Sequence, residues 1–141
     1  MRFIQSTPQT YVNALKREQV EWPVKEDDFF PYSSDPHWYW SGFYSSRPAF
    51  KKQVRDASAA WSAHSKLLAR KVIDLGTKDN EIEAILKAQH KTLDGLGVSQ
   101  HHDAITGTAK QYVTNDYSYR LWKGVGESRE LYKQELISRV K

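Results

Sequence analysis

The sequence contains no cysteine and no long apolar run, and each absence excludes a class of chemistry or structure. Without cysteine, these 141 residues can form no disulfide, no thiol nucleophile and no thiolate-bound metal site. No stretch approaches the roughly 20 apolar residues of a membrane-spanning helix, and the first residues lack the apolar run of a secretory signal peptide. A glycine-rich phosphate loop and internal repeats are also absent. We therefore expect no membrane partner.

The charge is basic overall but dispersed along the chain. Lys and Arg total 21 against 17 Asp and Glu, which gives a net charge of +4. Basic residues alternate with acidic ones, as in Lys51, Lys52, Arg55 and Asp56, a pattern typical of a solvated helix face. We therefore expect no nucleic-acid partner. The rival hypothesis, a helical scaffold that contacts nucleic acid, would predict steeply salt-dependent binding.

Apolar residues recur at helical spacing in four parts of the chain. Capping residues, prolines and glycines set the expected limits. These signals predict a short helix over residues 7–18, a long helix capped by Ser46 and running from Pro48 to Gly76, a second from Thr77 or Asp79 to Gly97, and a third capped by Thr108, which Gly124 and Gly126 bend. Short connections make consecutive long helices antiparallel neighbours. The predicted fold class is all-α: a three-helix bundle preceded by a short helix and an aromatic-rich irregular segment.

The irregular segment, residues 22–48, contains four prolines and many aromatic residues. Disordered chains are poor in aromatic residues, so we expect this segment to be ordered. Its most unusual part is the stretch from Asp35 to Gly42, in which Trp38, Tyr39 and Trp40 are consecutive. Aromatic faces suit the C–H faces of sugar rings. The alternative is that these rings only pin the segment to the bundle.

The junction between the second and third long helices contains His101, His102 and Asp103 side by side. Imidazole nitrogen and carboxylate oxygen suit zinc, but zinc requires about four ligands, and adjacent residues seldom all reach one ion. The junction therefore predicts one or two ligands of an incomplete site. The alternative is a helix junction whose histidines bond backbone carbonyls and in which Asp103 or Thr108 caps the third helix. His64 is predicted to be a hydrogen-bonded core histidine.

Four motifs, in their order and spacing, resemble the class II α-mannosidases of glycoside hydrolase family 38. They are DDFFPY at 27–32, YWSGFYSSRPA at 39–49, QHHDAITGTAKQ at 100–111 and NDY at 115–117. The resemblance covers residues 6–121. It implies that residues 1–46 are the end of an α/β catalytic domain and a connecting segment, and that residues 47–141 are a three-helix-bundle middle domain.

The resemblance also implies roles for particular residues. His102 would be a zinc ligand, Asp103 would bond sugar hydroxyls, Trp40 would stack on the sugar ring, and His101 would be orienting or structural. Zinc would be the cofactor, and a mannose-containing glycan and the rest of the mannosidase chain the partners. No catalytic residue lies in this chain, because the nucleophile, the general acid and the remaining zinc ligands belong to sequence outside it.

We therefore expect a fragment of a zinc-dependent retaining α-mannosidase that is inactive alone. The alternative is a non-catalytic carbohydrate-binding or interaction module derived from that family. The resemblance suggests the lysosome or the secretory pathway, while the sequence itself leaves the compartment open.

Overall fold

The computed structural model describes residues 3–140, which form four α-helices and one short 3-10 helix. The chain forms two compact units, one up to Tyr32 and one from Ser33 onward. The division differs from the predicted domain boundary at 46/47, which remains a prediction about the longer protein. None of the described helices is long and apolar enough to cross a membrane.

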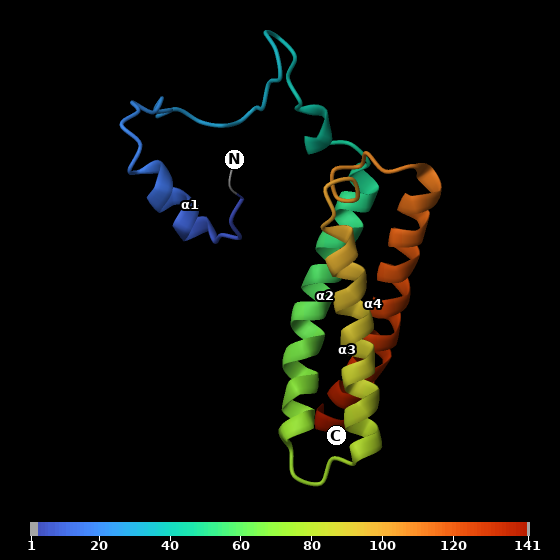
Figure 1. Ribbon diagram of the computed structural model, residues 1–141. Coiled ribbons are helices and arrows are strands. Elements are labelled where there is room, and N and C mark those ends of the chain that lie inside the picture. The colour runs from blue at the N-terminus through green and yellow to red at the C-terminus, as the bar shows by residue number, and fades with distance from the viewer. Residues whose placement is uncertain (1–2, 141) are drawn as a thin grey trace. The chain divides into compact units, whose positions relative to one another are not determined.

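The first unit contains the short helix α1, Pro8–Leu15 (Figure 1). Thr7 caps it, since its side-chain oxygen accepts a hydrogen bond from the Thr10 amide at 3.2 Å, and Pro8 occupies the first turn. The helix ends three residues earlier than predicted. The amides of Arg17 and Glu18 bond carbonyls only three residues back, which tightens the last turn. No residue of α1 is buried within its own unit.

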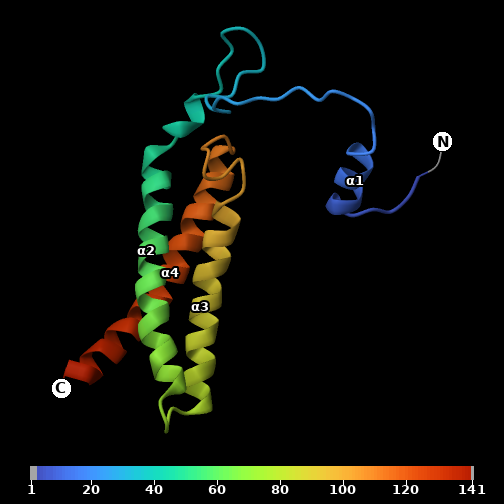
Figure 2. The ribbon, with the colours of Figure 1, turned by 90° about the vertical axis from the view of Figure 1, so that its left-hand side faces the viewer.

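The second unit is the predicted three-helix bundle, and the all-α fold class is confirmed. After the 3-10 helix η1, Gly42–Tyr44, come α2, Pro48–Ile73, α3, Asp79–Ser99, and α4, Gln111–Val140. Figures 1 and 2 show α2 and α3 running side by side in opposite directions, with α4 crossing them obliquely. Their apolar stripes form one core from all three helices and the α3–α4 loop, made of Phe50, Val54, Ala57, Leu96, Ala104, Leu121 and Val125.

Three predicted helix caps are wrong, because other groups take those positions. Arg47, not Ser46, is the N-cap of α2. Lys78 is the N-cap of α3, and its amide bonds the Glu81 carboxylate at 3.2 Å. Thr77 instead donates its hydroxyl to the Lys71 carbonyl at the end of α2. Thr108 does not cap α4, which begins at Gln111, because its hydroxyl donates to Asp103.

The interior of the bundle contains a histidine, as predicted. His64 is 6% exposed, and its Nδ1 lies 2.7 Å from the Ser128 hydroxyl, a group that is itself fully buried. The ring also packs against Tyr132, with centroids 4.7 Å apart. Burial first, and the nearby Arg129 charge second, lower the pKa of His64, so the ring is neutral in the folded bundle at neutral pH.

Helices α3 and α4 approach closely at two glycines. A Cβ on Gly124 would lie 2.8 Å from the Thr92 Cα and 2.9 Å from the Lys91 carbonyl oxygen. A Cβ on Gly95 would lie 3.2 Å from the Arg120 carbonyl carbon. The prediction that Gly124 bends the third helix missed this role: Gly124 lies inside a continuous α4 and makes room for the backbone of α3.

Candidate functional site

The loop that joins α3 to α4 contains the predicted site residues and is held by its own backbone. Ala104 is 1% exposed and belongs to the hydrophobic core, which anchors the loop to the end of the bundle. The Ala104 amide bonds the His101 carbonyl at 2.9 Å, and the Ala109 amide bonds the Asp103 carbonyl at 2.8 Å. With Ala104 buried, the side chains of the three preceding residues stand at the surface of the loop.

His101, His102 and Asp103 converge at one point. Their candidate ligand atoms all lie within 4.8 Å of one another. The Nε2 atoms of His101 and His102 lie 3.5 and 3.6 Å from the same carboxylate oxygen, Oδ2 of Asp103. The two imidazole rings pack together with centroids 4.3 Å apart. Because the loop turns at this point, adjacent side chains meet that would point apart on an extended segment.

The two oxygens of Asp103 have different environments. Oδ1 accepts a hydrogen bond from the Thr108 hydroxyl at 2.7 Å, while Oδ2 faces the imidazoles. The Thr108 hydrogen bond, followed by the charges that His102 and His101 carry when protonated, lowers the pKa of Asp103. The group is therefore a carboxylate at neutral pH. With about half of its side chain exposed, it can accept hydrogen bonds from a ligand.

The first residues of α2 hold this loop from the other side. Arg47 donates to the carbonyls of Gly107 and Ala109 at 3.2 and 3.0 Å, and to the side-chain oxygen of Gln111 at 2.6 Å. Lys51 donates to the Ile105 carbonyl at 2.7 Å and to the Ser46 carbonyl at 2.6 Å. The side chain of the α2 N-cap and one from its first turn therefore bind oxygens of four alternate residues, from Ile105 to Gln111.

Trp40 belongs to a separate stretch of the same unit. Its indole N–H donates to the Ser34 hydroxyl at 3.0 Å, across a small turn closed by the isolated bridge between Ser33 and Tyr39. The side chains of Trp38, Tyr39 and Trp40 are all more than half exposed. These three side chains therefore remain largely accessible, and a role in binding a sugar stays a prediction.

The residues of the loop fit part of a zinc site. Two imidazole nitrogens and a carboxylate oxygen are ligand types that zinc prefers, and a convergent set within 4.8 Å matches ligands on one side of an ion. His102 has 84% of its side chain exposed and is the most accessible of the three. Among residues 3–140 no other histidine, cysteine or carboxylate belongs to this group.

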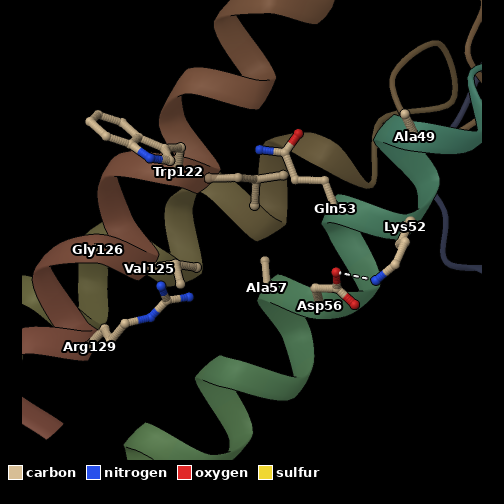
Figure 3. A pocket seen from close by; sticks show the side chains of 10 residues that line it. Ala49, Lys52, Gln53, Asp56, Ala57, Trp122, Val125, Gly126 and Arg129 are labelled. Atoms are coloured by element: carbon tan, nitrogen blue, oxygen red, sulfur yellow. Dashed lines mark hydrogen bonds and ion pairs between the residues drawn. The ribbon is translucent and has the colours of Figure 1, made fainter. Parts of the chain in front are cut away.

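A hollow elsewhere on the bundle contains none of the predicted site residues. It is a groove of about 370 Å³ between α2 and α4, with Ala57, Leu121 and Val125 in its floor and Trp122 on one side. Figure 3 shows its rim, where Lys52 pairs with Asp56 and Arg129 lies across from them. The groove and the loop are therefore two different surfaces.

Sequence reasoning predicts roles for His102, Asp103 and Trp40 but none for Arg47 and Lys51. The family resemblance includes the letters SSRP but assigns no role to the arginine. A helix N-terminus usually favours acidic residues, because it carries a partial positive charge. Cations at the start of α2 were therefore the available signal that these side chains bind another part of the folded chain.

Comparison with known proteins identifies what this chain is similar to. Residues 38–137 match the family model described as the α-mannosidase middle domain. An α-mannosidase of Arabidopsis thaliana is 38% identical over 96% of this chain, and a probable α-mannosidase of the same plant is 42% identical over 93%. The human lysosomal α-mannosidase is 38% identical, also over 93%. The aligned part is only 12–13% of the length of these relatives.

Proposed function

The chain belongs to the α-mannosidase family, in which its residues 38–137 correspond to the middle domain, and on this premise we propose that the longer protein is a zinc-dependent retaining α-mannosidase. It would hydrolyse terminal α-mannosides of glycans. The chain spans about an eighth of the length of its relatives. In this proposal it contributes one edge of the active site and is inactive alone.

In this proposal His102 is a zinc ligand and Asp103 contacts the sugar. When bound, zinc would hold the sugar by its ring hydroxyls. His102 offers Nε2 at the exposed surface of the loop, and Asp103 accepts a hydrogen bond from a sugar hydroxyl through Oδ2, since Oδ1 is occupied by Thr108. Trp40, which is more than half exposed, would stack on the sugar ring.

The observation that carries the proposal is the convergence of His101, His102 and Asp103 at one exposed point of a loop anchored in the core. A capping or junction role would not require two imidazoles to meet a carboxylate whose other oxygen is already bonded. The proposal places the two carboxylates of the retaining scheme, nucleophile and general acid, in sequence outside this chain.

The test is hydrolysis of an aryl α-mannoside by the longer protein, with His102→Ala, Asp103→Asn and the matched control His90→Ala on the exposed face of α3. We expect His102→Ala to lower kcat/KM by at least about 100-fold, since loss of a group that only orients a metal ligand already costs about 10–100-fold, while His90→Ala leaves it unchanged.

Two results would contradict the proposal. Full activity of His102→Ala would show that this loop is not part of the active site. Zinc-dependent turnover by the 141-residue chain alone would show that no outside residue is needed.

A further inference from the structure

The strongest unassigned feature of the molecule is the group of cationic contacts between the start of α2 and the α3–α4 loop. Arg47 and Lys51 make five hydrogen bonds, four of them to backbone carbonyls, at 2.6–3.2 Å. Hydrogen bonds from a charged donor are roughly twice as strong as neutral ones. Neither side chain has a carboxylate partner in an ion pair among residues 3–140.

These contacts lie one hydrogen bond away from the candidate site. Ala109 donates its amide to the Asp103 carbonyl at 2.8 Å and offers its own carbonyl to Arg47. Ile105 donates its amide to the His101 carbonyl at 3.3 Å and offers its carbonyl to Lys51. Displacing either cation would therefore free the carbonyl of a residue whose own amide directly bonds the backbone of His101 or Asp103.

The backbone is constrained on both sides of this contact. Arg47 has φ 51°, a left-handed conformation that is uncommon for residues other than glycine and costs of order a kcal/mol in similar cases. Gly107 opposite it has φ 81°, and a Cβ there would lie 2.7 Å from the Ser46 carbonyl oxygen. The strained conformation aims the Arg47 guanidinium at the loop, and the missing side chain at Gly107 lets the two segments touch.

We infer that Arg47 and Lys51 are positioning residues, which hold the α3–α4 loop in the shape that brings His102 and Asp103 to the active site. The role in catalysis rests on the proposed function, whereas the effect on the loop does not. Lys51 lies between two carbonyls, and burial followed by the charge of Arg55 lowers its pKa. The cations act on carbonyls behind the loop and touch neither imidazole.

The first arm of the test measures amide hydrogen exchange by NMR in this chain. Lys51→Met and Arg47→Gln should speed exchange of the Ala109 and Ile105 amides at least 10-fold, while the Leu121 amide in the core of α4 exchanges at the original rate. The control Lys52→Met removes a neighbouring lysine that is 74% exposed and pairs with Asp56, and it should change none of these amides. Unchanged loop exchange in folded Lys51→Met and Arg47→Gln would overturn the inference.

The second arm measures kcat, KM and zinc affinity in the longer protein. We expect Lys51→Met and Arg47→Gln to lower kcat or zinc affinity about 10–100-fold, as for other groups that orient a metal ligand, with Lys52→Met unchanged. Lys51→Arg should restore activity to within about threefold, since it keeps a charged donor, and Arg47→Lys should not, because lysine lacks the fork that binds two acceptors. Equal failure of Lys51→Arg and Lys51→Met would overturn the positioning role.

The two arms separate the two ideas. If the longer protein cleaves no mannoside even unmutated, the proposed function fails, while the exchange data still decide whether the cations hold the loop. Circular dichroism would reveal a variant that does not fold. In that case the conservative changes Lys51→Arg and Arg47→Lys are used for both the amide-exchange and the activity measurements.

Discussion

Adding a single methyl group to Gly124 should drive α3 and α4 apart. The Cβ of Gly124→Ala would lie 2.8 Å from the Thr92 Cα and 2.9 Å from the Lys91 carbonyl oxygen. Both are backbone atoms, so no side chain can swing away to make room, and the helices themselves must move. Thr92 is fully buried at this point, which leaves no loose packing nearby to absorb the shift.

The size of the effect follows from two opposing terms. Replacing glycine by alanine in a helix interior gains about 1 kcal/mol of helix propensity. Overpacking a filled interior costs about 1–3 kcal/mol. Gly126→Ala is the matched control, since it lies on the same helix two residues later, is exposed, and would place its new methyl group with nothing within 4 Å. Both changes gain a similar amount of helix propensity, so the difference between their free energies of unfolding isolates the steric cost.

The assay is urea unfolding of this chain followed by circular dichroism. Gly126→Ala should raise the free energy of unfolding by up to about 1 kcal/mol. The free energy of unfolding of Gly124→Ala should be about 1–3 kcal/mol lower than that of Gly126→Ala. Gly95→Ala, whose nearest backbone contact would be 3.2 Å, should fall between them. Equal stabilisation by Gly124→Ala and Gly126→Ala would refute the close approach of the two helices at this point.

Two further predictions concern the core. Leu121→Ala should lower the free energy of unfolding by about 2–5 kcal/mol because Leu121 is fully buried, whereas the fully exposed Leu75→Ala should stay within about 0.5 kcal/mol; similar urea midpoints would contradict this. The lowered pKa of His64 means that the unfolded chain binds more protons between the two pKa values, so stability should be complete above about pH 6.5 and fall as the pH drops through that value towards the folded pKa. Urea titrations at several pH values should lose this step in His64→Gln and keep it in His90→Gln.

The long helices could be predicted because their apolar residues repeat with the period of a helix. Phe50, Val54 and Ala57 on α2, and Leu121 and Val125 on α4, follow from spacing alone and lie in the core. The helix starts were less predictable. Thr108 is a good cap by residue type, but its hydroxyl bonds Asp103, a choice that depends on the fold of the loop.

The candidate site shows the same division between local pattern and tertiary contact. The letters QHHD identify donors suited to zinc, and the family resemblance assigns roles to His102 and Asp103. The convergence of three consecutive side chains depends on a turn of the loop around buried Ala104, which no periodicity predicts. The contacts of Arg47 and Lys51 join residues more than 50 positions apart in the sequence, so only the folded bundle reveals them.

Zinc titration calorimetry tests the central claim most directly, with this chain and with the longer protein, each as the original sequence and as His102→Ala. If the loop is one edge of a shared site, tight zinc binding should occur only in the longer protein, and His102→Ala should weaken it. Tight binding by the 141-residue chain alone, or tight binding by the longer protein that His102→Ala leaves unchanged, would contradict the account.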